Sequence, residues 1–186
     1  MIDIRTLDSL DADALRRIIS GYTSHEKYRV LKSETDVHTS ITLELVTLPA
    51  PYVKVYDHLD DDTLAQYAAV VGKGWSLGAF EGETLVGVLL AEVHAWNQTL
   101  WVWEFHVSES QRGRGIGQQL MDRLAARGRA QGLRAMVCET QSTNVPAIRF
   151  YRKAGFTLQG VDISYYSNQD YPDGEMAIFM KKHLLT

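Results

Sequence analysis

A glycine-rich turn is the segment whose residue types and spacing most directly suggest chemistry. It lies between the apolar run 100–107, which predicts a strand, and residues 116–131, which predict a helix. Free backbone N–H groups and the positive end of the helix dipole favour anions at a helix start. The three glycines let a bulky anion approach the backbone, and the two arginines add positive charge. We therefore predict a pyrophosphate site formed by Arg112, Gly113, Arg114, Gly115, Ile116 and Gly117.

The glycine turn alone does not distinguish a phosphate site from an ordinary tight turn before a helix. It is not a P-loop, because no Gly-Lys-Ser/Thr sequence closes it. It does not match the dinucleotide-binding fingerprint either, because position 118 holds Gln118 instead of glycine. For the turn by itself, a phosphate site and an ordinary structural turn therefore both stay open. A second motif favours the phosphate site.

The second motif is a short predicted helix with clear start and stop signals. Asn144 is a typical N-cap, and Gly155 follows the predicted helix 145–154 as its stop. Together with the glycine turn, this motif resembles the GCN5-related N-acetyltransferase (GNAT) superfamily. The residues that carry the resemblance are Arg112, Gly115, Gly117, Asn144, Ala147, Phe150, Tyr151, Gly155 and Phe156.

The resemblance implies an α/β fold, with a mixed, splayed β-sheet of about six or seven strands flanked by about four helices. It implies a single domain over residues 1–186, with a variable acceptor-side part at about 1–75 and a coenzyme A-binding core at about 100–156. In this superfamily the glycine turn binds the pyrophosphate of coenzyme A, so acetyl-CoA is the expected co-substrate. The residues expected to contact its pantetheine arm are Phe105, His106, Val107, Asn144 and Tyr151.

Acetyl transfer to an amine requires a base for the ammonium and an acid for the leaving thiolate. By the resemblance, Tyr151 is expected to protonate the thiolate, because an ordinary tyrosine is a proton donor at neutral pH. Helical spacing alone would instead make Tyr151 a core residue. Glu104 is the candidate base, since a lone carboxylate in an apolar strand is costly unless it is paired or functional.

The assignment of the base has alternatives. Strict alternation along the strand predicts that Glu104 and His106 share one face with Val102. The opposite face is predicted to carry Trp101, Trp103, Phe105 and Val107. His106 could therefore replace Glu104 as the base, or Glu104 could be a structural residue paired with a nearby arginine or lysine. Many enzymes of this fold need no dedicated base, which is a further alternative.

Acidic and aromatic residues after the second motif suggest a site for a cationic amine. Residues 160–166 (GVDISYY) and 175–180 (EMAIFM) are similar to the streptothricin acetyltransferases, a group within the superfamily that acetylates a cationic antibiotic. Carboxylates and aromatic faces both attract ammonium groups. Ordinary loop and cross-strand residues would give the same composition, so this alternative stays open. The candidate substrate residues are Glu104, Asp162, Tyr165, Tyr166 and Glu175.

These motifs predict an acetyl-CoA-dependent N-acetyltransferase in which the amine attacks the thioester directly in a ternary complex. The first expected acceptor is a small cationic amine, such as a streptothricin- or aminoglycoside-like antibiotic. A protein N-terminus or lysine is the second acceptor class. The alternative outside enzymes is a non-catalytic acyl-CoA-binding sensor domain, which the presence of both Glu104 and Tyr151 disfavours.

Composition sets further bounds on partners and location. The chain has 186 residues, a formal net charge of −4 and one cysteine, Cys138, which fits a reducing cytoplasm. The negative charge argues against nucleic acid as a partner, and no apolar run is long enough to span a membrane. The histidines lack metal-ligand spacing, so we expect no metal. A homodimer is compatible with the sequence, since dimers are common in the superfamily.

Alternating helices and strands must position these candidate residues. Helices are predicted from Asp11 or Asp13 to about Gly21, and at 63–71, 116–131 and 145–154. Strands are predicted at 2–5, 75–80, 84–94, 100–107, 133–140, 157–164 and 175–181, the last two as an antiparallel pair. Residues 39–56 predict two short strands or one strand and an extended arm, and the polar segment 23–37 cannot be placed.

Overall fold

The computed structural model describes residues 1–57 and 59–185 and divides the chain into two compact units. The first unit contains Met1–Gly21, Val55–Cys138 and Lys182–Thr186. The second unit contains Tyr22–Lys54 and Glu139–Lys181. Each unit therefore combines segments that lie far apart in the sequence.

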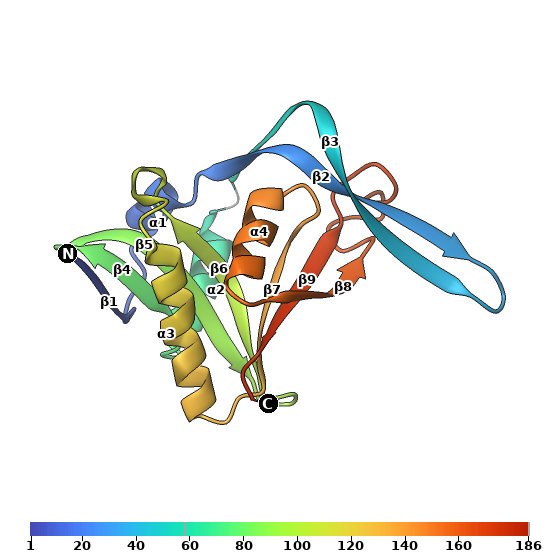
Figure 1. Ribbon diagram of the computed structural model, residues 1–186. Helices are drawn as coiled ribbons and strands as arrows, with labels where there is room; N and C mark the ends of the chain where they lie inside the picture. The colour runs from blue at the N-terminus through green and yellow to red at the C-terminus, as the bar shows by residue number, and fades with distance from the viewer. Residues whose placement is uncertain (58, 186) are drawn as a thin grey trace. The chain divides into compact units, whose positions relative to one another are not determined.

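Nine strands and four α-helices form among the described residues, and seven strands share one mixed sheet (Figure 1). The strand order is β1-β4-β5-β6-β7-β9-β8, while β2 and β3 form a separate two-stranded sheet. The predicted α/β class and the expected sheet and helix numbers are confirmed. The elements are β1 (Ile2–Thr6), α1 (Ala12–Ile18), β2 (Gly21–Glu34), β3 (Thr39–Val55), α2 (Asp61–Val71), β4 (Leu77–Glu81), β5 (Thr84–His94), β6 (Thr99–Val107), α3 (Ile116–Ala130), β7 (Ala135–Gln141), α4 (Val145–Lys153), β8 (Thr157–Asp162) and β9 (Ala177–His183).

In the first unit, β1, β4, β5 and β6 form an antiparallel ladder. β6 also pairs in parallel with β7, where Thr99 lies opposite Ala135. β4 and β5 are joined by the predicted hairpin, in which Gly82 adopts a φ of +62°. That left-handed conformation favours glycine. The ladder therefore holds β6, the strand of the candidate base, between β5 and β7.

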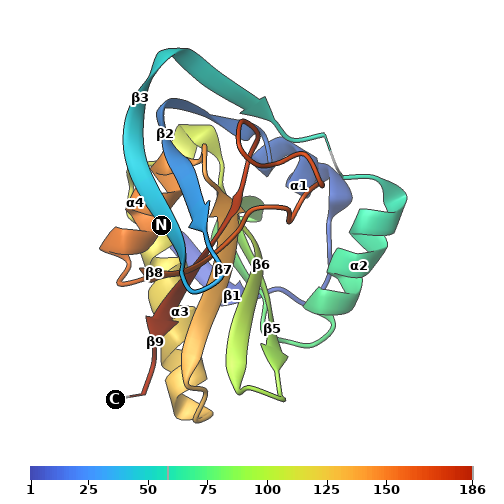
Figure 2. The same ribbon diagram turned by 90° about the vertical axis from the view of Figure 1, so that its right-hand side faces the viewer.

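Helices cover both faces of the first unit's strands (Figure 1, Figure 2). α3 lies over one face, where a Cβ added to Gly87 would be 3.4 Å from both Ile116 and Leu120. α1 and α2 lie over the opposite face. The buried cluster there includes Leu15, Ile18, Tyr67, Val70, Val71, Val88 and Leu90. Burial of each aliphatic side chain contributes about 1.5–3 kcal/mol, so packing fixes which strand residues face α2.

Aspartates cap the two helices on that face. Asp11 Oδ1 accepts a hydrogen bond from the backbone N–H of Ala14 at 3.0 Å, so Asp11 rather than Asp13 caps α1. Asp60 Oδ1 accepts from the backbone N–H of Thr63 at 2.8 Å at the start of α2. Each cap satisfies an N–H group that the helix itself leaves without a partner, and typically contributes about 1 kcal/mol.

A β-bulge interrupts the regular pairing of β5 with β6. Leu90 of β5 pairs with Glu104, whereas the next residue, Ala91, pairs with Val102. Trp103 is therefore an extra residue in β6 that has no counterpart in β5. Because Leu90 and Ala91 point to opposite faces of the sheet, Glu104 and Val102 must also lie on opposite faces.

The bulge makes part of the predicted face assignment wrong. Glu104 and His106 share one face, as expected, because they pair with Leu90 and Val88 of β5. Trp101 lies on this same face, since it pairs with Glu92, two residues beyond Leu90. Val102 lies on the other face. One inserted residue shifts the alternation by one position, and sequence periodicity alone does not show it.

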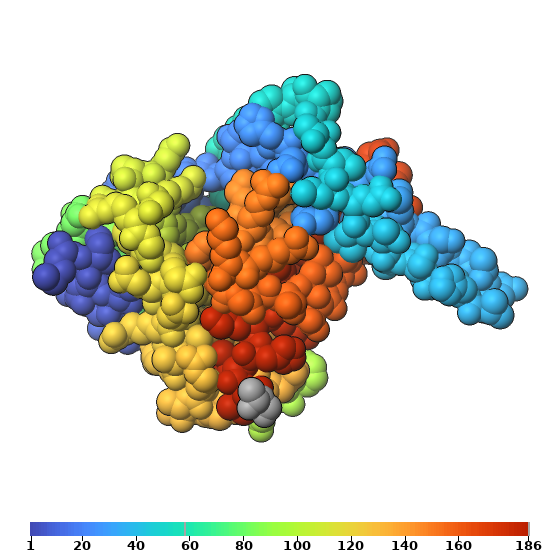
Figure 3. All heavy atoms as spheres, in the orientation of Figure 1, coloured from blue at the N-terminus to red at the C-terminus, as the bar shows by residue number. Residues whose placement is uncertain are grey.

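The second unit contains the segment that sequence reasoning left unplaced. β2 accounts for most of residues 23–37, and Thr39–Val55 forms one continuous strand, β3, rather than two strands or a strand and an arm. The two strands make a long ribbon whose hairpin end stands clear of the rest of this unit (Figure 1, Figure 3). At that end the backbone N–H of Thr35 donates to His38 O at 2.8 Å.

The C-terminal strands of the second unit pair as predicted. β8 and β9 are antiparallel, with Thr157 opposite Lys181 and Asp162 opposite Ala177. α4 precedes them and begins after Asn144. This part of the unit carries the second motif and most of the candidate substrate residues.

Candidate active site

The predicted phosphate site is an open left-handed turn at the start of α3. Gly113 and Gly115 adopt φ values of +78° and +77°, which a side chain would strain. Gly115 is the N-cap of α3, and a Cβ added to Gly113 would meet no atom within 4 Å. Gly117 lies inside the helix, so only two of the three glycines serve the turn conformation. The N–H groups of Ile116, Gly117 and Gln118 belong to the first turn, whose donors have no intrahelical partner.

The two arginines of the turn are exposed and bonded to their neighbours. Arg114 Nη1 and Nη2 each lie 3.3 Å from Glu81 Oε1, and Nη1 also donates to Gln111. Arg112 Nε donates to Val107 O at 3.1 Å. Exposed ion pairs contribute only about 0–1 kcal/mol, so a bound anion can compete for the guanidinium of Arg114.

Glu104 is held on the face that α2 covers. The hydroxyl of Tyr67, in α2, donates to Glu104 Oε1. His106 Nε2 lies 2.6 Å from Glu104 Oε2. The side chains of Glu104 and His106 are only 15% and 14% exposed. Tyr56 packs edge-to-face against His106, with ring centroids 5.6 Å apart. The structure therefore brings the two alternative bases together as one hydrogen-bonded pair.

Tyr67 is a functional candidate that sequence reasoning missed. Burial raises the pKa of Tyr67, and the charge of Glu104 and the hydrogen bond to it raise this pKa further. A tyrosine with a raised pKa keeps its proton at physiological pH and so remains a donor. In the sequence, Tyr67 lies on the apolar stripe of α2 and has the pattern of an ordinary core residue. Only the pairing of distant segments reveals its contact with Glu104.

A second carboxylate lies further along the same face. Glu92 is 7% exposed, accepts a hydrogen bond from Trp103 Nε1 at 2.8 Å and forms an ion pair with Lys73. Burial raises the pKa of Glu92, but the hydrogen bonds from Lys73 and Trp103 outweigh it and hold this pKa below its ordinary value. His94 stacks on Trp101, with ring centroids 5.5 Å apart. Glu92 therefore anchors the bulge residue Trp103 and is satisfied by protein partners.

In the second unit, Asn144 caps α4 as predicted. Its Oδ1 accepts from the backbone N–H of Ala147 at 3.2 Å. Tyr151 lies in α4 and is 6% exposed. Its ring packs against Phe150 and Phe156, with centroid distances of 5.6 and 5.5 Å. This burial is compatible with both a core role and a proton-donor role, so the acid role of Tyr151 stays a prediction.

Two of the candidate substrate residues, Tyr165 and Tyr166, lie beside the carboxylate of Glu139. The hydroxyl of Tyr166 donates to Glu139 Oε1, and Tyr165 contacts Tyr166 edge-to-face at 5.3 Å between centroids. Partial burial and the charge of Glu139 raise the pKa of Tyr166. Asp162 instead accepts from the backbone N–H of Ser164 at 2.9 Å and stabilises the turn after β8. The exposed tyrosine pair with Glu139 has the composition of a cation-binding surface.

Glu175 already has a protein ammonium as its partner. Lys54 Nζ, from β3, lies 2.5 Å from Glu175 Oε2. Thr143 Oγ1 and the Tyr22 hydroxyl donate to Oε1 at 2.5 and 3.1 Å. Burial raises the pKa of Glu175, but the bonds from Lys54, Thr143 and Tyr22 outweigh it and lower this pKa. A substrate ammonium would have to displace Lys54 or share the carboxylate with it.

A buried aspartate shapes the loop that presents the tyrosine pair. Asp170 is 6% exposed and accepts from the backbone N–H groups of Tyr166 and Ser167 at 2.8 and 3.0 Å. The Ser167 hydroxyl donates to it at 2.6 Å. Burial raises the pKa of Asp170, but these hydrogen bonds outweigh it and lower this pKa. The carboxylate therefore stays ionised and fixes the backbone direction at Tyr166.

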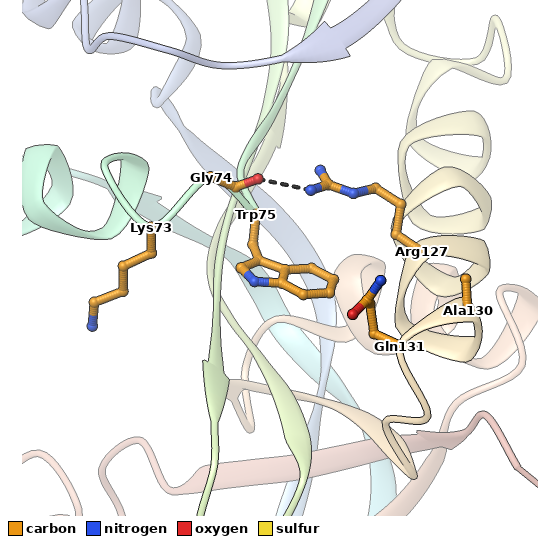
Figure 4. A pocket seen from close by; sticks show the side chains of 6 residues that line it. All are labelled: Lys73, Gly74, Trp75, Arg127, Ala130 and Gln131. Carbon is orange, nitrogen blue, oxygen red and sulfur yellow. Dashed lines mark hydrogen bonds between the residues drawn. The ribbon is translucent and has the colours of Figure 1, made fainter.

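A recess of about 330 Å³ lies in the first unit, and Figure 4 shows the side chains that line it. Arg127 Nη2 donates to Gly74 O at 2.8 Å, and the guanidinium lies 4.9 Å from the ring centroid of Trp75. At 1.5 Å per residue, Arg127 is roughly 18 Å along α3 from Gly115. The recess is therefore separate from the predicted coenzyme site. Its lining residues are Lys73, Gly74, Trp75, Arg127, Ala130 and Gln131.

Two further kinds of functional feature are absent from the described residues. No helix in this part of the chain is long and apolar enough to cross a bilayer. Within residues 1–57 and 59–185, no three or more His, Cys, Asp or Glu side chains are grouped so that they would hold a metal ion. Cys138, the one cysteine of the chain, is buried in β7.

Known sequences similar to this chain are acetyltransferases. The sequence model of the acetyltransferase (GNAT) family matches residues 42–156. A streptothricin acetyltransferase of Escherichia coli is 31% identical over 157 residues, which cover 83% of this chain and 84% of that protein. The matched residues include both the glycine turn and the second motif.

Solved structures of similar proteins share the fold over nearly the whole chain. The crystal structure of a nourseothricin acetyltransferase aligns over 99% of both chains, with a TM-score of 0.78 and 28% identity. A candidate streptothricin acetyltransferase of Bacillus anthracis, in complex with acetyl coenzyme A, aligns over 98% of this chain and 99% of that chain. The TM-score of this alignment is 0.73. At 23% sequence identity, the similarity indicates a shared fold alone.

Proposed function

This chain belongs to the acetyltransferase (GNAT) family, and we propose that it transfers acetyl from acetyl-CoA to a primary amine of a small cationic molecule. The class of enzyme, an acetyl-CoA-dependent N-acetyltransferase, follows from the family. The acceptor class is supported by the names of the relatives, which acetylate streptothricin or nourseothricin. The acidic and aromatic surface of the second unit is also compatible with such an acceptor.

The glycine turn is the observation that carries the proposal. A pyrophosphate needs several N–H donors converging from one side and room for its oxygens. Gly113 and Gly115 leave that room, and the first turn of α3 supplies the donors and the positive end of its dipole. Arg112 and Arg114 lie exposed beside them. The residues of this turn therefore fit the pyrophosphate of coenzyme A.

The pantetheine arm is proposed to align along β6. Amide groups of an extended ligand can pair with strand main chain as an additional strand does. Asn144, already the cap of α4, is proposed to contact the same arm. The main-chain groups proposed for this pairing are those of Phe105, His106 and Val107.

Residues of the chain are proposed to handle the two protons of the reaction. The thioester of acetyl-CoA supplies the electrophilic carbonyl. The hydrogen-bonded pair of Glu104 and His106 would take the proton that the acceptor's ammonium must lose before it attacks. Tyr151 would protonate the thiolate that leaves. Direct attack in a ternary complex needs no covalent enzyme intermediate.

The acceptor's other charges are proposed to bind the second unit. Tyr165 and Tyr166 offer exposed aromatic faces beside the carboxylate of Glu139. Ammonium groups of a polyamine-like molecule bind such faces with about 0.5–2 kcal/mol each. Asp162 and Glu175 are weaker candidates, because a backbone turn and Lys54 already use their oxygens.

Thiol release from acetyl-CoA, measured against a panel of amines, tests the proposal. The panel contains streptothricin, an aminoglycoside, a polyamine, free lysine and a short peptide. We expect rapid turnover with at least one cationic antibiotic and slow or no turnover with the peptide. Turnover with the peptide alone would replace the acceptor class. Coenzyme binding without turnover on any amine would instead support a non-catalytic sensor.

A further inference from the structure

Both carboxylate oxygens of Glu104 are engaged by residues from different elements. Tyr67 of α2 donates to Oε1, and His106 Nε2 lies 2.6 Å from Oε2. An ionised carboxylate only accepts hydrogen bonds, so Nε2 of His106 carries the hydrogen in this contact. Direct protonation of Glu104 by a substrate would have to compete with these two bonds.

The other ring nitrogen of His106 is the available proton acceptor. A neutral histidine carries a hydrogen on one ring nitrogen and a lone pair on the other. Because Nε2 donates to Glu104, the lone pair lies on Nδ1. Among the residues that the structure describes, none forms a hydrogen bond with Nδ1 of His106. The neutral ring therefore presents one basic nitrogen.

We propose that His106 Nδ1 accepts the proton of the acceptor's ammonium, that Glu104 orients the ring, and that Tyr67 is a positioning residue for Glu104. This division of roles rests on the proposed function, because it names the base of that same reaction. One N–H bond of the ammonium breaks, and its proton forms a bond to Nδ1. The electron pair left on the amine nitrogen then attacks the thioester carbonyl. The imidazolium is stabilised by Glu104 across the 2.6 Å contact.

The surroundings of the pair make its internal contact strong. α2 contributes Tyr67, whose hydroxyl stays protonated, and the segment before α2 contributes the ring of Tyr56. Hydrogen bonds between charged groups strengthen where apolar side chains exclude water. The residues of β5 opposite the pair are both apolar and fully buried: Val88 and Leu90.

The test is the pH dependence of kcat/KM for variants of the three residues, with the fastest amine of the panel as acceptor. His106→Gln should lower kcat by about 10²–10⁴-fold and remove the acid limb of the profile. Coenzyme affinity, measured by calorimetry, should stay within about twofold, because the side chain is not proposed to bind coenzyme. His183→Gln, an exposed histidine of β9, is the matched control and should behave as wild type.

Two variants should move the acid limb in opposite directions. Glu104→Gln should move it to lower pH, because the imidazolium loses its carboxylate. Tyr67→Phe should move it to higher pH, because the carboxylate loses a competing donor and holds the imidazolium more strongly. Tyr28→Phe, a buried tyrosine of β2, is the control and should leave the limb in place. A merely structural role of Tyr67 would lower activity without shifting the profile.

The outcomes separate this inference from the proposed function. The assignment would be overturned if His106→Gln kept wild-type turnover and an unchanged acid limb while Glu104→Gln lost the acid limb. Glu104 would then be the direct base. Shifts of the limb in the same direction for Glu104→Gln and Tyr67→Phe would overturn the positioning role. Absence of wild-type turnover with every amine would overturn the proposed function and, with it, this assignment.

Discussion

Gly115 is the residue on which coenzyme binding should depend most. Its φ of +77° would strain any side chain, and it begins the helix whose N–H groups are proposed to hold pyrophosphate. Gly115→Val should weaken binding of coenzyme A by at least about 100-fold, the free energy of about two lost charge-assisted hydrogen bonds. Calorimetry measures this directly. Gly82→Val carries similar strain in the β4–β5 hairpin and should bind normally; equal weakening of both variants would contradict the phosphate site.

Tyr151 should act only in the chemical step. Tyr151→Phe keeps the ring that packs on Phe150 and Phe156 and removes only the hydroxyl. If this hydroxyl protonates the thiolate, kcat should fall at least roughly tenfold while coenzyme affinity changes little. Steady-state thiol release and calorimetry together give both quantities. Unchanged kcat would leave Tyr151 as a core residue.

Glu175 should make stability depend on acid pH. Its folded-state pKa is lowered, since its bonds to Lys54, Thr143 and Tyr22 outweigh burial. Its contribution is therefore fully present above the unfolded pKa, ordinarily near about 4.3, and is lost as pH falls through the folded value. Lys54→Met should cost roughly 1–3 kcal/mol at pH 7 and much less at low pH. Denaturant unfolding at both pH values checks this, and an equal cost at both would refute it.

At the scale of elements, the bulge in β6 lets Glu104 and Val102 lie on opposite faces although one residue separates them. Deleting Trp103 would make the pairs Leu90–Glu104 and Ala91–Val102 consecutive, so β6 would pair regularly and Glu104 would stay on its face. We expect the deletion to retain turnover within about tenfold, because Glu104 and His106 keep their partners in β5 and still face Tyr67. Trp103→Ala keeps the bulge, loses the bond to Glu92 and the ring contact with Trp101, and should also retain turnover within about tenfold. Large losses in both variants would show that the indole matters, and a large loss in the deletion alone would show that the bulge itself positions the pair.

Local patterns predicted the elements that carry their own start and stop signals. Asn144 and Gly155 bound α4, and Gly82 marks the β4–β5 hairpin, so these elements agree with the structure. The ribbon β2–β3 was harder, because much of it is exposed and its buried residues, Ser24, Tyr28 and Val30, form no regular apolar alternation. The bulge at Trp103 was invisible, because one extra residue leaves composition and local hydrophobicity unchanged.

Within the candidate site, sequence reasoning found the residues but not their partners. Glu104 and His106 were recognisable from their place in an apolar strand. Tyr67 was not, because its contact with Glu104 joins residues that are far apart in the chain. The same holds for Lys54, which neutralises Glu175 from a strand that no local signal placed beside it. Contacts between residues that are far apart in the chain can be identified only when the fold is known.

At the scale of the whole molecule, acetyl-CoA should stabilise the folded chain. A ligand present at 100 times its Kd adds about 2.7 kcal/mol to the free energy of unfolding. For a chain of this size, that corresponds to a rise in Tm of roughly 5–10 °C. Thermal unfolding with and without acetyl-CoA measures it. Gly115→Val should show no rise; a rise as large as in wild type would place the coenzyme away from the turn.

The interleaving of the two units has a consequence for biosynthesis. Tyr22–Lys54 leaves the ribosome first, but the rest of its unit, Glu139–Lys181, follows only after the whole of Val55–Cys138. At about 5–20 residues per second, the ribbon spends several seconds without its partner segment. Its apolar side chains Leu31, Ile41 and Leu45 are exposed even in the finished fold. The nascent chain should therefore be a client of chaperones during translation, and slowing synthesis after Lys54 should raise its aggregation.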